Sequence, residues 1–422
     1  MRYGGMTYAD LFRAFARIGL LSFGGPAAQI ALMHRELVDE RRWLTEAEFL
    51  RALSFCMMLP GPEAMQLAAY AGWKLRGTGG GLLAGLLFVL PGAVVIATLA
   101  LLYLSFGDQP LVRAAFVGVK AAVIAIVIEA LLRVAKRALK GRLHLAIAAT
   151  AFLALGVLHL PFPLVILCAG LIGALASRPG KTAPQAAPPL TGAVRVALVA
   201  GALWAAPLLA AKAVGATFLF EIGAFFSKLA IVTFGGAYAV LAYMAQDVVT
   251  GRGWLSPHQM IDALGLAETT PGPLILVTQF VAMLAGAAEG GMPIALLAGA
   301  MTLWVTFVPC FLWIFAGAPY IDWLASKPRL SAALSGITAA VVGVILNLSV
   351  WFALHVGFRS VGGATFGPVR LPMPDLASAD LLAIVLAGLA SYLLLQRHWG
   401  LGKVLALCAT LGLVLGRLGG LG

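Results

Sequence analysis

The chain of 422 residues is 61% hydrophobic and only 11% charged, with a formal net charge of +12 and a mean hydropathy of +0.98. Soluble proteins carry about a quarter charged residues, so this composition excludes a soluble globular fold. Several apolar stretches exceed the roughly 20 residues that cross a bilayer. The sequence predicts an all-α polytopic membrane protein, because the alternating segments of about ten residues that mark a β-barrel are not visible.

The first half begins with two interrupted helical pairs. Residues 8–39 are broken at Ser22-Phe23-Gly24-Gly25-Pro26. Thr45, with Glu48 three residues later, predicts a capping box that starts the next helix. That helix is broken at Pro60-Gly61-Pro62 and resumes to about Lys74. Four cleaner apolar spans then follow, near 81–105, 111–133, 143–159 and 162–177.

A proline-rich linker, residues 178–192, divides the chain into two transporter repeats. The first repeat is 1–177 and the second is 193–422. The second repeat opens with an extra apolar span near 193–212 and then follows the plan of the first. Its interrupted pairs lie at 217–249 and 256–286, and its spans near 292–318, 330–356, 380–396 and 401–420.

One motif recurs in both repeats at a constant offset of 211 residues. Phe23-Gly24-Gly25, Trp43-Leu44 and Pro60-Gly61-Pro62 return as Phe234-Gly235-Gly236, Trp254-Leu255 and Pro271-Gly272-Pro273. From Phe23 to Pro62, 15 of 40 positions are identical to their partners, which indicates an internal duplication. Gly and Pro break helices. Breaks at matching places in apolar segments predict a substrate site built from interrupted membrane helices.

The loop charges predict the topology. Basic clusters at 133–142 and 178–195 favour the cytoplasmic side. The arginine-rich loop 34–51 falls on that side only if the interrupted segments are re-entrant hairpins; the alternative is that they span. The re-entrant arrangement predicts an inverted repeat of about nine spans and four hairpins, with the N-terminus inside and the C-terminus outside.

Hairpin tips that meet near the midplane would direct free N–H groups and positive helix ends at one point, which suits an anion. An alternative interpretation of the breaks is that they are simple kinks or close-packing points. The alternative for the cations Arg17 and Lys228 is that their side chains extend along the helix to the membrane interface. The candidate substrate-binding residues are Ser22, Gly24, Gly25, Pro60, Gly61, Pro62, Gln66, Thr233, Gly235, Gly236, Thr269, Thr270, Pro271, Gly272, Pro273 and Gln279, with Arg17 and Lys228 as cations.

Three charged residues are candidates for proton coupling. Glu63 and Glu268 flank the two proline motifs, and Lys120 lies in the middle of a span, where a charge is functional by default. Glu129 is expected to pair with Arg133, one turn later. The histidines and the four cysteines are dispersed, so neither a metal site nor a cofactor is expected.

These motifs, namely Phe23-Gly24-Gly25-Pro26, Trp43-Leu44 and Leu59-Pro60-Gly61-Pro62 with their partners up to Pro271-Gly272-Pro273-Leu274, resemble those of the chromate ion transporter family. The resemblance covers both halves and matches the long, two-domain form. It implies a multi-pass protein of a bacterial or archaeal inner membrane that exports chromate and confers chromate resistance, driven by the membrane potential, a proton gradient or both.

The expected partners are chromate, its analogue sulfate and the bilayer, without nucleic acid; a homodimer stays open. The first alternative function is transport of sulfate or another small anion. The second, a membrane-embedded enzyme, would need paired acids or a His-Glu-x-x-His motif at membrane depth, and the sequence has neither. The protein is therefore not expected to be an enzyme.

Overall fold

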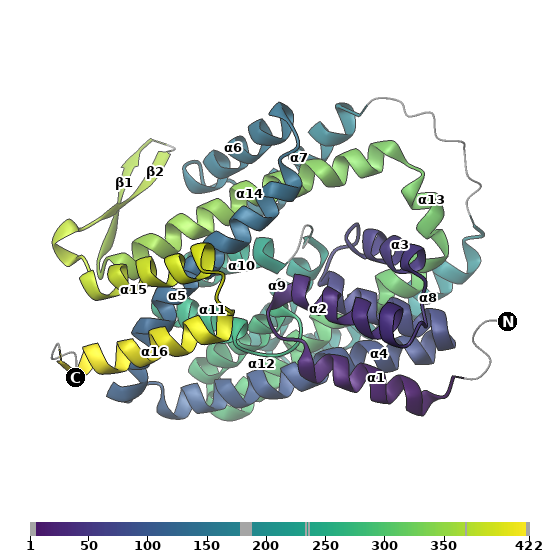
Figure 1. Ribbon diagram of the computed structural model, residues 1–422, viewed down its shortest axis with the longest axis horizontal. Helices are drawn as coiled ribbons and strands as arrows, with labels where there is room; N and C mark the ends of the chain where they lie inside the picture. Colours follow the sequence, from purple (N-terminus) through teal and green to yellow (C-terminus); the bar gives the residue numbers. More distant parts are fainter. Residues whose placement is uncertain (1–5, 178–187, 233, 235–236, 368, 419–422) are drawn as a thin grey trace. The chain divides into compact units, whose positions relative to one another are not determined.

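The computed structural model describes residues 6–177, 188–232, 234, 237–367 and 369–418. In these ranges the chain is helical apart from one small sheet (Figure 1). The first-half helices are α1 (Tyr8–Leu21), α2 (Gly25–His34), α3 (Glu46–Cys56), α4 (Glu63–Phe106), α5 (Pro110–Ala138), α6 (Arg142–Gly156) and α7 (Phe162–Leu175). The second-half elements are α8 (Thr191–Ala213), α9 (Thr217–Val232), α10 (Ala237–Gln246), α11 (Pro257–Glu268), α12 (Val277–Gly317), α13 (Ile321–Ala325), α14 (Pro328–Gly357), β1 (Val361–Phe366), β2 (Val369–Pro374), α15 (Leu381–Ser391) and α16 (Leu401–Leu418).

The predicted interruption between α1 and α2 is confirmed, as is the one between α3 and α4. The capping box that starts α3 is also confirmed. The backbone N–H of Glu48 donates to Thr45 Oγ1 at 3.3 Å, and the backbone N–H of Thr45 donates to Glu48 Oε2 at 2.9 Å. Two N–H groups of the first turn are thereby satisfied by side chains.

The two longest helices, α4 and α12, are each a tight helical hairpin. Both kinks have nearly the same backbone angles: Gly77 has φ 63° and ψ −159°, and Gly291 has φ 70° and ψ −161°. A Cβ added to Gly72 would lie 2.6 Å from that of Ala84, twelve residues later, a separation that a straight helix would stretch to about 18 Å. The arms therefore fold back on each other, and small residues allow their close contact.

Among the described residues, five helical segments are long and apolar enough to cross a membrane. They are Glu63–Phe106, Pro110–Ala138, Thr191–Ala213, Leu274–Leu324 and Pro328–Gly357. Large apolar side chains such as Leu167, Leu171 and Leu198 are exposed on the helix surfaces. Apolar surface on this scale has to face lipid or protein rather than water. The chain is thus an all-α polytopic membrane protein, as the composition predicted.

The sheet was not predicted. Strands β1 and β2 pair antiparallel, with Val361 opposite Pro374 and Phe366 opposite Val369. They lie between α14 and α15, in a segment whose glycines and prolines disfavour helix.

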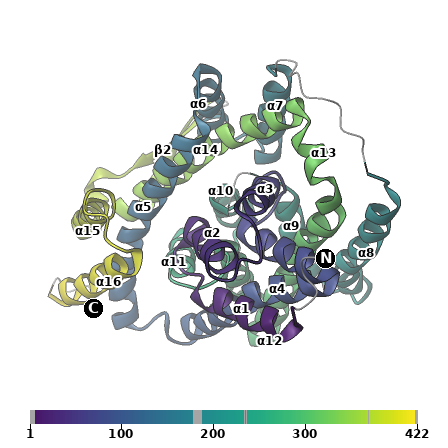
Figure 2. The same ribbon diagram turned by 45° about the vertical axis from the view of Figure 1, so that its right-hand side comes forward.

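The chain divides into two compact units, and each unit contains parts of both sequence repeats. Unit 1 comprises Met1–Ala100, Arg178–Val240 and Ala267–Ser331, and unit 2 comprises Leu101–Ser177, Leu241–Leu266 and Ala332–Gly422. In unit 1, α8 and α9 pack against α12. In unit 2, α15 and α16 lie beside α5 in both views (Figures 1 and 2). A Cβ on Gly118 of α5 would meet Cys408 O of α16 at 1.8 Å, so this glycine permits the close approach.

Candidate functional site

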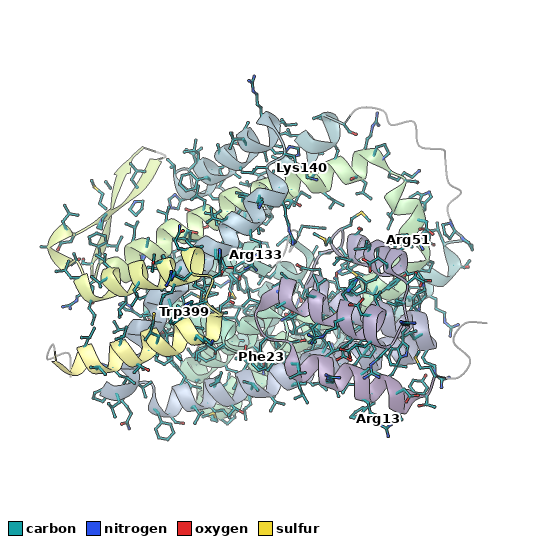
Figure 3. The ribbon with its side chains drawn as sticks, in the orientation of Figure 1. Arg13, Phe23, Arg51, Arg133, Lys140 and Trp399 are labelled. Atoms are coloured by element: carbon teal, nitrogen blue, oxygen red, sulfur yellow. The ribbon has the colours of Figure 1, made fainter. Side chains whose placement is uncertain are left out.

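The broken segments of unit 1 contain the strained backbone that the motif predicted. Gly24 and Gly25 have φ of 85° and 76°, Gly61 has 116° and Gly272 has 86°. L-residues with a side chain rarely adopt these values, so glycine is required here. Phe23, labelled in Figure 3 between α1 and α2, is half-exposed beside the first break. Thr233, Gly235 and Gly236 of the matching break lie outside the described residues.

Two hydrogen bonds join the first repeat's Gly-Gly break to the second repeat's Pro-Gly-Pro break. The backbone N–H of Gly272 donates to Ser22 O at 2.9 Å. The side-chain amide of Gln29 donates to Gly272 O at 2.7 Å and to Ser22 O at 3.3 Å. Ser22 and Gln29 are buried. Residues 243 positions apart in sequence thus satisfy backbone groups that the broken helices leave unpaired.

Each Pro-Gly-Pro break also contacts a long helix of the other repeat. A Cβ on Gly61 would lie 2.9 Å from Cys310 Sγ of α12. A Cβ on Gly92 of α4 would lie 2.2 Å from Pro271 O. Both contacted residues directly follow a proline inside their helix, Pro309 or Pro91. The two repeats therefore make reciprocal contacts within unit 1.

Several polar side chains near the breaks donate hydrogen bonds to nearby backbone carbonyls. The amide of Gln66 donates to Pro60 O at 2.7 Å. The hydroxyls of Thr270 and Thr278 donate to Ala267 O and Ile275 O at 2.9 and 2.7 Å. Thr269 is exposed. These side chains hold the breaks in shape, because carbonyl groups left unpaired in a membrane are costly.

The charged candidates take different environments. Arg17 lies 3.2 Å from the fully buried carboxylate of Glu36, measured between Nη1 and Oε1. Lys228 is on an exposed position of α9. Glu268 is buried and accepts a hydrogen bond from the Tyr238 hydroxyl at 2.9 Å, whereas Glu63 is half-buried at the start of α4. Arg17 is therefore the counter-ion of a buried acid in this structure.

Two threonines on α12 were missed by the sequence analysis. Thr302 and Thr306 are buried, four residues apart, on the helix face that also carries Cys310. Their hydroxyls have no hydrogen-bond partner within the part of the chain that the structure describes. Elsewhere the hydroxyls of Thr98 and Thr338 donate to the carbonyl one turn earlier, at 2.9 and 2.8 Å. The spacing of four in an apolar helix was the available signal.

Three buried amide oxygens share this lack of a partner among the described residues. They are the Oε1 atoms of Gln29, Gln66 and Gln279. A buried polar atom without a hydrogen bond costs about 1–3 kcal/mol. Native proteins avoid that cost unless a ligand or water completes the bond. Each of these glutamines follows a break in the chain, so each break of unit 1 that the structure describes is followed by a buried amide oxygen without a partner among the described residues.

Charged side chains in the segment from α2 to α3 form ion pairs. His34 Nε2 lies 2.5 Å from Glu46 Oε2, and this hydrogen bond raises the pKa of His34. The Thr45 backbone N–H, followed by Lys74 at 2.9 Å, lowers the pKa of Glu48 to about 2. Arg51 on α3, labelled in Figure 3, lines a cavity of about 280 Å³ with Asp322 of α13. The ion pairs of His34 with Glu46 and of Lys74 with Glu48 thus stabilise the segment from α2 to α3.

In unit 2, Lys120 of α5 pairs with Asp262 of α11, at 3.2 Å between Nζ and Oδ1. Asp262 is buried and was not singled out from the sequence, although its apolar neighbours Ile261 and Ala263 were an available signal. The expected pair of Glu129 with Arg133 is confirmed.

The model of the family described as chromate transporter matches residues 9–174 and 220–414, and therefore covers both repeats. The chain belongs to the chromate transporter family. It is 36% identical over 371 residues to the chromate transport protein of Pseudomonas aeruginosa, covering 86% of each chain. It is 32% identical over 352 residues to the chromate transport protein of Cupriavidus metallidurans, covering 82% of this chain and 83% of that one.

The chain is also similar to a more distant relative. An uncharacterized transporter, MJ0718, of the archaeon Methanocaldococcus jannaschii is 26% identical over 357 residues, which cover 82% of this chain and 85% of the relative. No solved structure matches the chain. The family, together with the apolar helices, identifies a multi-pass membrane transporter.

Proposed function

We propose that the protein exports chromate from the cytoplasm across the bacterial or archaeal inner membrane and so confers chromate resistance. The observation that carries the proposal is the pair of hydrogen bonds that joins Gly272 to Ser22 and to Gln29. They join breaks of both repeats, in a chain of the chromate transporter family. Irregular backbone at membrane depth persists only where it is buried in protein or lines a cavity, and secondary transporters build their substrate sites from such broken helices.

The breaks supply donors that suit a tetrahedral dianion. Helix α2 begins at Gly25 without a side-chain cap, so N–H groups of its first turn point out of the helix. The unpaired hydroxyls of Thr302 and Thr306 are further donors in the same unit. Neutral donors and a helix end bind an oxyanion without the strong attraction of a buried cation, which permits release.

The membrane potential supports export. Moving one charge through 100 mV is worth about 2.3 kcal/mol, so a dianion leaving an inside-negative cell gains about 4.6 kcal/mol. A proton gradient is the second source of energy in this proposal.

The test is chromate flux in liposomes that contain the purified chain, with the potential set by a potassium gradient and valinomycin. We expect flux that grows with the potential and is absent from empty liposomes. Flux independent of both the potential and the pH gradient would contradict the energetic proposal. No flux under any condition would contradict chromate transport itself.

Sulfate is the second candidate substrate, because it has the same charge and shape as chromate. Counterflow of radiolabelled sulfate against chromate distinguishes the two. We expect chromate inside the liposomes to drive sulfate exchange only weakly. Faster exchange of sulfate than of chromate would assign the protein to sulfate and make chromate incidental.

A further inference from the structure

Unit 2 contains a buried polar cluster built from three helices. Asp262 of α11 lies 3.2 Å from Lys120 of α5, between Oδ1 and Nζ. Its other oxygen, Oδ2, accepts a hydrogen bond of 2.8 Å from the hydroxyl of Tyr103, near the end of α4. Asp262 is only 4% exposed. Gly265, one turn later, keeps α11 close to α5, since a Cβ there would lie 2.6 Å from Val119.

The cost of this arrangement argues against a purely structural role. Withdrawing two charges from water is expensive, and apolar residues of similar volume often stabilise a fold as well or better. Ionisable residues inside a membrane protein therefore mark ion or proton paths in most cases. Lys120 lies in one of the five apolar spans, with its side chain 20% exposed, so the cluster is not completely enclosed by protein.

The chemistry of the three groups suits a proton. The carboxylate can take up a proton and become the neutral acid, which changes the cluster's net charge from zero to +1 while Lys120 stays charged. A hydroxyl both donates and accepts, so Tyr103 can donate to the carboxylate and accept from the acid. Tyr103 can therefore hold Asp262 in place in both states.

The surrounding titratable groups are few among the described residues. Lys120 and Tyr103 face Asp262 from α5 and α4. On its own helix, His258 lies one turn earlier, and it interacts electrostatically with Lys120 and with His355 of α14. Near Tyr103, Asp108 and Arg113 form an exposed ion pair at 2.6 Å.

We propose that Asp262 is a proton-binding residue of the transport cycle, with Lys120 as its counter-ion and Tyr103 as its hydrogen-bond partner. This inference rests on the proposed chromate transport and names the residue through which a proton influences that transport. Lys120 is thereby reassigned from a lone proton carrier to the partner of an acid.

The first experiment measures chromate flux in liposomes at a fixed potential while the pH varies between about 5 and about 9. Wild-type flux should change about tenfold per pH unit on one side of a midpoint. Asp262→Asn should keep flux within about twofold over the same range. Tyr103→Phe should move the midpoint and keep the pH dependence, whereas the control Asp108→Asn should leave the wild-type profile unchanged.

The double variant Lys120→Gln with Asp262→Asn controls for misfolding. It removes both charges together, so neither is left without its counter-ion. It should also give a flat profile. If the pair were only structural, the double variant would transport with the wild-type pH dependence. That result, a pH-dependent Asp262→Asn variant, or a pH-independent wild type would overturn the proposal.

A second measurement does not depend on transport. Infrared difference spectra of the purified chain are recorded as the pH falls, and the spectra of the double variant, which keeps the other carboxylates, are subtracted; the carbonyl band of one carboxylic acid should remain. If liposomes move no chromate, the proposed function fails while this titration still reports on Asp262. The absence of a remaining band after this subtraction would overturn the assignment.

Discussion

At Gly92, helix α4 passes so close to the second proline motif that no side chain fits. An added Cβ would lie 2.2 Å from Pro271 O, a backbone atom that cannot rotate away. Overpacking of this kind typically costs about 1–3 kcal/mol. We expect Gly92→Ala to lower the thermal unfolding temperature and to reduce chromate flux at least about tenfold, measured on purified protein in detergent and in liposomes.

Gly201 on α8, in the same unit, is the matched control for Gly92. An added Cβ meets no atom within 4 Å, and alanine is the better helix former by about 1 kcal/mol. Gly201→Ala should therefore leave flux unchanged and stability equal or higher. Equal behaviour of the two variants would show that the contact with Pro271 is unimportant.

Substitution of Arg17 tests whether this cation near the first break interacts with the substrate or only with the buried carboxylate of Glu36. We expect Arg17→Ala to reduce chromate flux at least about tenfold, and Lys228→Ala to do the same at normal membrane levels. Removing the half-exposed Arg17 also takes one partner from a buried carboxylate, which destabilises the fold. Glu36, which also pairs with Arg41 at 3.3 Å, would then be left with less compensation.

The double variant Arg17→Gln with Glu36→Gln separates these roles. Protein levels should recover, because no buried charge is left without its partner. Flux should stay low, since the positive charge is still missing. Recovered flux in the double variant would make Arg17 a structural counter-ion only.

At the scale of elements, the junction between α2 and α3 is expected to weaken as the pH rises. Contacts with Glu46 and then Asp39 raise the pKa of His34, so the folded state favours the protonated ring. Its stabilisation is complete below the unfolded pKa of about 6.5 and is lost as the pH rises through the higher folded value.

The measurement is the difference in unfolding temperature between the wild type and His34→Gln. It should be larger at about pH 6 than at about pH 9, where the wild-type ring is neutral. Glu46→Gln should give the same pattern, because it removes the main partner at 2.5 Å. A difference that does not vary with pH would mean that the charged pair contributes nothing.

At the scale of the whole molecule, the inverted arrangement makes a prediction about sidedness. Single cysteines at exposed positions, Ala47→Cys and Thr250→Cys, are introduced into a chain whose four cysteines are replaced by serine. A membrane-impermeant maleimide should label them from opposite faces of intact cells and inverted vesicles. Labelling from the same face would contradict the inverted repeat.

Local patterns in the sequence determined the helices and the broken segments. Hydrophobic stretches, helix breakers and the capping box act over a few residues, so Thr45 with Glu48, the α1–α2 break and the Glu129–Arg133 pair were predicted correctly. The offset of 211 also predicted the second Pro-Gly-Pro break, where Gly272 has a φ of 86°, because a duplication stays visible in the residue types.

Only the tertiary structure decided which groups meet. The bonds from Gln29 to Gly272 and from Tyr103 to Asp262 join residues 243 and 159 positions apart, and no local pattern encodes such distances. The β1–β2 hairpin was missed because its glycines and prolines resemble a loop. The proline and glycine breaks are thus a property of the sequence. The hydrogen bonds between the breaks depend on tertiary packing, because backbone groups that a break leaves unpaired in a membrane need partners that only the fold can supply.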